Sequence, residues 1–86
     1  SSFSIGDQVS LNIIVYPNPV SEIINIKGLE NQEFKSNIYN LNGVLIKSYI
    51  NKSTINVENL PNGFYFLEII DPLKNKKVVK KLMKAN

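Results

Sequence analysis

The side chains that could perform chemistry in this chain are serines, lysines and carboxylates, because its 86 residues include neither His nor Cys. The usual proton shuttle, the thiol nucleophile and the common transition-metal ligands are therefore missing. A serine activated by a lysine remains, for example Ser48 beside a neighbouring lysine, but no serine lies in a strained turn that would expose a nucleophile. We expect no catalytic residues and no enzyme.

The acidic residues are spread along the chain, and none follows the spacing of a calcium-binding loop. They are Asp7, Glu22, Glu30, Glu33, Glu58, Glu68 and Asp71. Solvated surface charge accounts for such a distribution, so we expect neither a metal site nor a bound cofactor.

The basic residues are all lysines, and the formal net charge is only +3. Lysine offers a point charge in place of the planar fork with which arginine reads phosphates and guanine edges. No apolar run approaches the roughly 20 residues that a membrane-spanning helix needs. We therefore expect no nucleic-acid partner and no membrane insertion.

Short segments of strand-like pattern, separated by turn signals, follow one another from residue 11 onward. They are 11–16, 22–27, 34–41, 44–50, 54–57, 64–70 and 76–83. Residues 1–10 lack such a pattern, so we predict a linker or arm over 1–10 and a folded domain over 11–86. No segment has a convincing helical period. The predicted fold is all-β, a single immunoglobulin-like β-sandwich of about seven short antiparallel strands.

Turn residues divide these strands at three positions. Pro17 and Pro19 end the first strand, because proline fixes φ and donates no backbone hydrogen bond. Asn42-Gly43 favours the positive φ values of a two-residue hairpin turn. Tyr65, which follows a Pro-Asn-Gly corner, is placed like the tyrosine corner of immunoglobulin-like sandwiches, where the phenol bonds back to the preceding connection.

The two last strands differ in their expected positions. Residues 64–70 are apolar on nearly both faces, which is typical of a strand in the middle of a sheet, with Tyr65, Leu67 and Ile69 toward the core. The lysines of 76–83 suit an exposed edge strand, where charge discourages unwanted pairing.

Three motifs, in the same order as here, occur in a known family. They are Val15-Tyr16-Pro17-Asn18-Pro19, Ile38-Tyr39-Asn40-Leu41-Asn42-Gly43 and Leu60-Pro61-Asn62-Gly63-Phe64-Tyr65. Together with the basic last strand, they resemble the type A C-terminal sorting domain of the Bacteroidetes type IX (Por) secretion system. Asn40 stands where that family more often has Asp, and residues 83–86 run past its basic apolar motif.

The resemblance implies a secretion signal. Such a domain is fused behind a cargo domain, is read by the type IX translocon or its outer-membrane shuttle, and is removed by a separate sortase-like protease. It implies an exported protein, periplasmic in transit and then secreted or held at the cell surface. Self-association through edge strands stays open.

The residues of the resemblance fall into two groups. The candidates for translocon recognition form the last strand, because an edge strand offers backbone donors and acceptors while its lysines steer the encounter. They are Lys76, Lys77, Val78, Val79, Lys80, Lys81 and Leu82. The remaining family positions are expected to be mainly structural. They are Tyr16, Pro17, Asn18, Pro19, Tyr39, Gly43, Leu60, Gly63 and Tyr65.

One alternative function belongs to a different class, a small immunoglobulin-like adhesive or carbohydrate-binding module of an extracellular protein. It requires aromatic side chains aligned on one exposed face. The sequence offers Tyr16, Tyr39, Tyr49 and Phe66 for such a platform.

Overall fold

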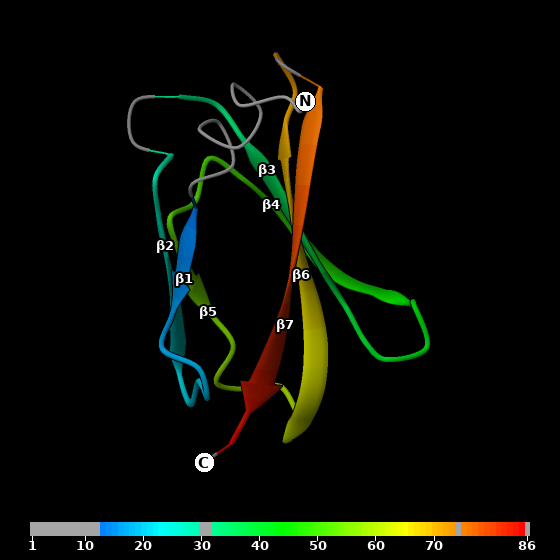
Figure 1. Ribbon diagram of the computed structural model, residues 1–86. Coiled ribbons are helices and arrows are strands. Elements are labelled where there is room, and N and C mark those ends of the chain that lie inside the picture. Colours follow the sequence, from blue (N-terminus) through cyan, green and yellow to red (C-terminus); the bar gives the residue numbers. More distant parts are fainter. Residues whose placement is uncertain (1–12, 30–31, 74, 86) are drawn as a thin grey trace, which may run out of the picture.

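The computed structural model describes residues 13–29, 32–73 and 75–85, which contain seven β-strands and no helix (Figure 1). The strands are β1 (Ile14–Tyr16), β2 (Ile23–Lys27), β3 (Lys35–Tyr39), β4 (Leu45–Ile50), β5 (Thr54–Asn56), β6 (Gly63–Asp71) and β7 (Lys76–Lys84). This part of the chain has no helix long and apolar enough to cross a membrane. The predicted all-β class is confirmed.

The strands form two antiparallel sheets that face each other (Figure 1). One sheet has the order β1-β2-β5, and the other has the order β4-β3-β6-β7. The three-stranded sheet corresponds to strands A, B and E of an immunoglobulin-like sandwich. The four-stranded sheet, read in the order given, corresponds to strands C′, C, F and G. The predicted architecture is therefore confirmed, with β6 inside its sheet and β7 at its edge.

The core lies between the two sheets, because side chains alternate between the faces of each strand. Tyr65, Leu67 and Ile69 of β6 are buried, as the sequence predicted. Ile24 and Ile26 of β2 are buried opposite them. The other buried apolar side chains are Ile13, Val20, Leu29, Phe34, Ile38, Ile55, Val57 and Leu82. Leu11 of the predicted first strand, and the predicted arm over 1–10, lie outside the described residues, so the domain boundary stays a prediction.

The β3–β4 hairpin forms as predicted, but its turn is not the two-residue turn expected of Asn42-Gly43. The Gly43 amide donates to the Asn40 carbonyl at 3.0 Å, which makes Leu41 and Asn42 the central residues of the turn. Gly43 follows with φ of 80°, and the register shifts between Ile38 and Tyr39. The hairpin thus has a longer loop ending in a left-handed glycine. Asn40 explains why this longer loop forms, because its Oδ1 accepts from the amides of Asn42 and Val44 at 2.9 and 3.0 Å.

The corner before β6 matches its prediction. The Tyr65 hydroxyl donates to the Pro61 carbonyl at 2.6 Å, as in the tyrosine corner of immunoglobulin-like sandwiches. This bond fixes the connection between β5 and β6, and so the start of the strand that pairs with β7.

Candidate functional site

Strand β7 is an edge strand whose inner side is fully paired. It pairs with β6 without a register shift from Gly63↔Lys84 to Asp71↔Lys76. In an antiparallel ladder, the backbone groups of alternate residues point to opposite sides of the strand. Those of Lys77, Val79, Lys81 and Met83 therefore point away from β6, toward the open side of the sheet.

The C-terminal half of this open side is covered by the segment that follows β1. The Met83 amide donates to Asn18 Oδ1 at 3.0 Å, and Asn18 Nδ2 donates to the Lys81 carbonyl at 3.3 Å. The Val20 amide donates to the Met83 carbonyl at 2.8 Å, and the Ala85 amide donates to the Val20 carbonyl at 2.9 Å. We call these contacts of Asn18 and Val20 the clasp.

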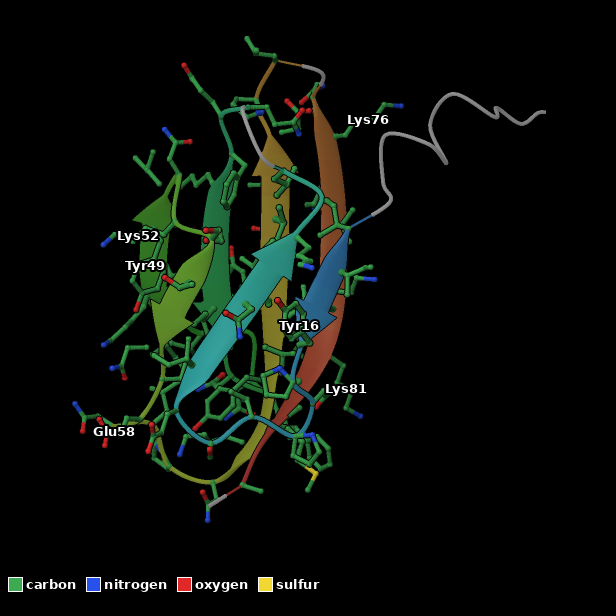
Figure 2. The ribbon with its side chains drawn as sticks, turned by 90° about the vertical axis from the view of Figure 1, so that its left-hand side faces the viewer. Tyr16, Tyr49, Lys52, Glu58, Lys76 and Lys81 are labelled. Atoms are coloured by element: carbon green, nitrogen blue, oxygen red, sulfur yellow. The ribbon has the colours of Figure 1, made fainter. Side chains whose placement is uncertain are left out.

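The clasp exists because the connection between β1 and β2 reaches the edge of the four-stranded sheet before the chain returns to the three-stranded sheet. The Tyr16-Pro17 and Asn18-Pro19 peptide bonds are both cis, and Val20 forms an isolated parallel bridge to Lys84. Figure 2 shows Tyr16 at the end of β1 and Lys81 on β7 at the same side of the sandwich. Two segments that the sequence separates, the Pro-Asn-Pro motif and the last strand, thus form one site.

The N-terminal half of the open side is not covered by any described residue. No hydrogen bond from the described part of the chain reaches the outward backbone groups of Lys77 and Val79, or the Lys81 amide. We call residues 77–81 the open half of β7. A further strand can add to the four-stranded sheet at this segment, as it can at β4 on the opposite edge, but the open half of β7 is the one that lies beside the clasp.

The lysines of β7 divide between the two faces of the strand. Lys77 and Lys81 are exposed on the outer face of the sheet, with the exposed Val79 between them. Lys76 and Lys80 are half-buried on the inner face with Val78, and Leu82 is buried in the core. The predicted recognition residues therefore all lie on the edge strand, but only Lys77, Val79 and Lys81 among them are exposed to solvent.

A chain of polar contacts runs across the outer face of the sheet and ends at Lys77. Ser48 Oγ donates to Asn37 Oδ1 at 2.7 Å, and Asn37 Nδ2 donates to Glu68 Oε1 at 2.9 Å. Tyr39 donates its hydroxyl to the same oxygen at 3.0 Å. Lys77 Nζ lies 3.5 Å from Glu68 Oε2. Contacts with Asn37 of β3 and Glu68 of β6, the two central strands, thereby hold the Lys77 amine beside the open half.

These contacts shift two pKa values. The hydrogen bond from Asn37 lowers the pKa of Glu68 below its ordinary value of 4.5, helped by the Tyr39 hydroxyl and the Lys77 charge and opposed by burial. The bond to Glu68 raises the pKa of Tyr39 above 10.0. Glu68 is accordingly held as the carboxylate that Lys77 needs as a partner.

Lys81 occupies the other end of the open half. Its Nζ lies 4.7 Å from the centre of the Phe64 ring, within the range of a cation–π contact. Phe64 and Lys81, with Asn18, Pro19, Leu82 and Met83, also line a shallow hollow where the clasp meets β7. The charge of Lys81 is thus placed at the border between the covered and the open backbone.

The remaining family positions lie at turns, in the core or in hydrogen bonds of the described sandwich. Leu60 is half-buried against the core, and Gly63 opens β6 with φ of 146°. Tyr39 holds Glu68, and Gly43 forms the hairpin turn. Their mainly structural role remains a prediction.

The aromatic platform required by the adhesive alternative does not form. Tyr39 pairs with Phe66 on the outer face of the four-stranded sheet, whereas Tyr16 belongs to the other sheet. Tyr49 pairs with the buried Ser36 and packs against the core. The four side chains therefore do not share one exposed face, and the alternative loses the feature on which it depended.

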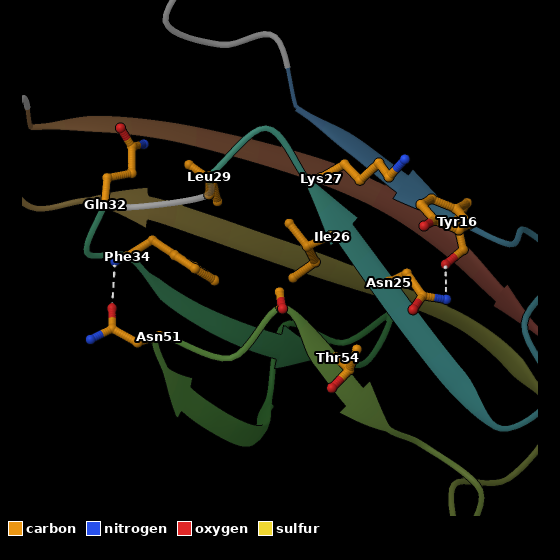
Figure 3. Close-up of a pocket in the computed structure, with 10 residues that line it drawn as sticks. Tyr16, Asn25, Ile26, Lys27, Leu29, Gln32, Phe34, Asn51 and Thr54 are labelled. Atoms are coloured by element: carbon orange, nitrogen blue, oxygen red, sulfur yellow. Dashed lines mark hydrogen bonds between the residues drawn. The ribbon is translucent and has the colours of Figure 1, made fainter.

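A second hollow lies beside β2, between Tyr16 and the residues that flank β3 (Figure 3). Two of its amide side chains already serve the fold. Asn25 Nδ2 donates to the Tyr16 carbonyl at 3.4 Å, and Asn51 Oδ1 accepts from the Phe34 amide at 2.9 Å. Lys27 is the charged residue of its described lining, and its Nζ lies 6.0 Å from the centre of the Tyr16 ring. Among the described residues, no cluster of His, Cys, Asp or Glu that could hold a metal lies here.

Sequence reasoning missed the partners that join the two motifs. It treated Asn18 as a mainly structural position, and it did not connect Asn37 and Glu68 with Lys77. The sequence did contain one signal of the clasp. Asn18 stands between two prolines, and its amide side chain can both donate and accept hydrogen bonds.

The fold and the clasped terminal strand define a small immunoglobulin-like β-sandwich domain with a basic edge. Comparison with protein families gives its particular kind. The model of the secretion system C-terminal sorting domain matches residues 14–85, and the chain belongs to this family. A comparison with curated proteins found no match. The domain is thus a sorting signal of the type IX secretion system, and the cargo it implies is secreted or displayed at the cell surface.

Proposed function

We propose that β7 is the part of this sorting domain that the type IX translocon or its outer-membrane shuttle reads. A separate sortase-like protease then removes the domain by cutting within or before residues 1–10. The observation that carries the proposal is the open half of β7, a basic edge that no described residue covers and that lies directly beside the clasped family motif.

The physical support has two parts. Uncovered donors and acceptors along a strand allow a partner to bind the backbone, which gives affinity. Exposed lysines attract an acidic partner and fix its orientation, which raises the association rate. On this proposal the cargo passes through the periplasm attached to a folded signal, and the domain supplies no catalytic group.

Export of a reporter fused ahead of residues 1–86, in a host with the type IX machinery, tests the proposal. The test variant is Lys77→Gln with Lys81→Gln, which neutralises the exposed lysines of the open half. The matched control is Lys47→Gln with Lys52→Gln, which removes the same charge from β4, the opposite edge strand, and from the segment that follows it. Figure 2 shows Lys52 on the side of the sandwich away from Lys81.

We expect export of the native and control fusions and strong loss for the test variant, with folding of each checked by protease resistance. A fusion ending at Pro72 should also be retained, but it loses the whole pairing with β6 and so needs the folding check most. Periplasmic retention of the folded native fusion would refute the sorting role. Equal export of the two lysine variants would refute recognition through β7.

A further inference from the structure

We infer that the open half of β7 binds an extended acidic segment of its partner as an added β-strand, and that the clasp sets where this pairing ends. The inference rests on the proposed function of β7. Its tests are therefore chosen so that failure of strand addition can be distinguished from failure of recognition through β7.

The backbone of β7 limits the added strand to a short stretch. Lys77 and Val79 each offer an outward N–H and C=O, and Lys81 offers its N–H. The Lys81 carbonyl and both groups of Met83 are already bonded to the clasp. A strand that arrives from outside can therefore pair along residues 77–81, but it meets Asn18 beyond that point.

The side chains define the chemistry of the added strand. Residues 76–81 read Lys-Lys-Val-Val-Lys-Lys, a pattern that is the same in both directions. On each face of the strand, one valine has a lysine two residues before it and another two residues after it. The complementary segment carries acidic residues opposite the lysines and apolar residues opposite Val78 and Val79, whichever way it runs.

A second copy of this chain fits the same edge badly. Antiparallel pairing of two β7 strands about Val79 would place Lys77 of each copy directly opposite Lys81 of the other. Like charges in direct cross-strand pairs are destabilising. Charge complementarity therefore favours an acidic segment of another protein over self-pairing.

The first test is a titration of the 86-residue chain with the peptide Glu-Glu-Val-Val-Glu-Glu, followed by NMR of the backbone amides. The control peptide, Glu-Val-Glu-Glu-Val-Glu, has the same composition and charge but sets valines opposite lysines. We expect slower hydrogen exchange at the Lys77, Val79 and Lys81 amides, and binding roughly fivefold stronger than for the control. Met83 and Ala85 should change little, because the clasp already bonds their amides.

Two results of this titration would overturn the inference. One is equal binding of both peptides, or protection of amides elsewhere. The other is concentration-dependent protection of the same three amides without peptide, which would make a second copy the occupant.

The second test is export of reporter fusions that carry Val79→Pro or, as control, Val79→Thr. Proline removes the outward N–H of residue 79, which β6 does not use, and proline is tolerated on such edges. We expect retention of the folded Val79→Pro fusion and export of the Val79→Thr fusion. Export of both, with the Lys77/Lys81 variant still retained, would overturn strand addition and leave the proposed function intact. If Val79→Pro does not fold, the titration decides alone.

Discussion

Asn18 and Met83 are joined by a hydrogen bond of 3.0 Å across 65 positions of sequence. The bond connects the motif that follows the first strand with the outward backbone of the last strand. Because Asn18 Nδ2 also reaches the Lys81 carbonyl, one side chain bonds β7 at two positions. The family motif thereby determines how much of the edge remains open.

Replacing Asn18 by Ala should destabilise the domain by about 1 kcal/mol, because two hydrogen bonds to the backbone of β7 are lost at a site that water still reaches. Asn18→Asp should cost less, since it keeps the oxygen that accepts from Met83. Urea unfolding measures both, with Asn59→Ala as a control on the surface. Faster exchange of the Met83 amide should accompany Asn18→Ala, and unchanged exchange would contradict the clasp.

Tyr65→Phe should lower the free energy of unfolding by about 1 kcal/mol, because it removes the half-buried bond to the Pro61 carbonyl. The matched control is Tyr16→Phe, which removes a hydroxyl from an exposed ring. Denaturant midpoints of the two variants give the comparison. If both variants matched the native midpoint, the corner bond would have no role in stability.

The strands could be predicted from the sequence because each depends on local signals. Alternation placed Tyr65, Leu67 and Ile69 in the core, where they are buried, and proline and glycine marked the connections. The exact form of the hairpin turn could not be predicted in this way. It depends on the Asn40 side chain, whose oxygen accepts from the amides of Asn42 and Val44 and so favours a turn centred one residue earlier.

The clasp and the contacts of Glu68 could not be predicted from local sequence patterns. Strand order decides that β7 lies at the edge beside residues 18–20, and that Asn37 stands opposite Glu68. Both follow from long-range pairing, which no spacing in the sequence encodes. The sequence therefore identified the two motifs, but it could not show that they meet.

Two serines on β3 and β4 should respond to alanine with opposite signs. Ser36 is fully buried, and its Oγ has no hydrogen-bond partner among the described residues, so Ser36→Ala should stabilise the domain by about 1 kcal/mol. Ser48 Oγ donates to Asn37, so Ser48→Ala should destabilise by about 0.5–1 kcal/mol. Thermal and urea unfolding test the pair, and a loss of stability in Ser36→Ala would show that its hydroxyl has a partner.

The stability of the domain should depend on pH through Glu68. The hydrogen bond from Asn37 holds its pKa below 4.5 in the folded chain. A carboxyl group whose pKa is lowered by folding binds its proton more weakly in the folded state than in the unfolded state. Its contribution is therefore complete above pH 4.5 and is lost as the pH falls through the lowered pKa.

Glu68→Gln isolates this contribution. At pH 7 the variant should be less stable than the native domain, because Lys77 loses its charged partner. The difference should shrink below pH 4.5, where the native carboxylate becomes protonated. Glu58→Gln, at an exposed turn, is the control and should follow the native curve. Urea unfolding between pH 7 and pH 3 gives the three curves. A constant gap between Glu68→Gln and native would place the titrating group elsewhere, because only a group that titrates differently in the two proteins can change their difference.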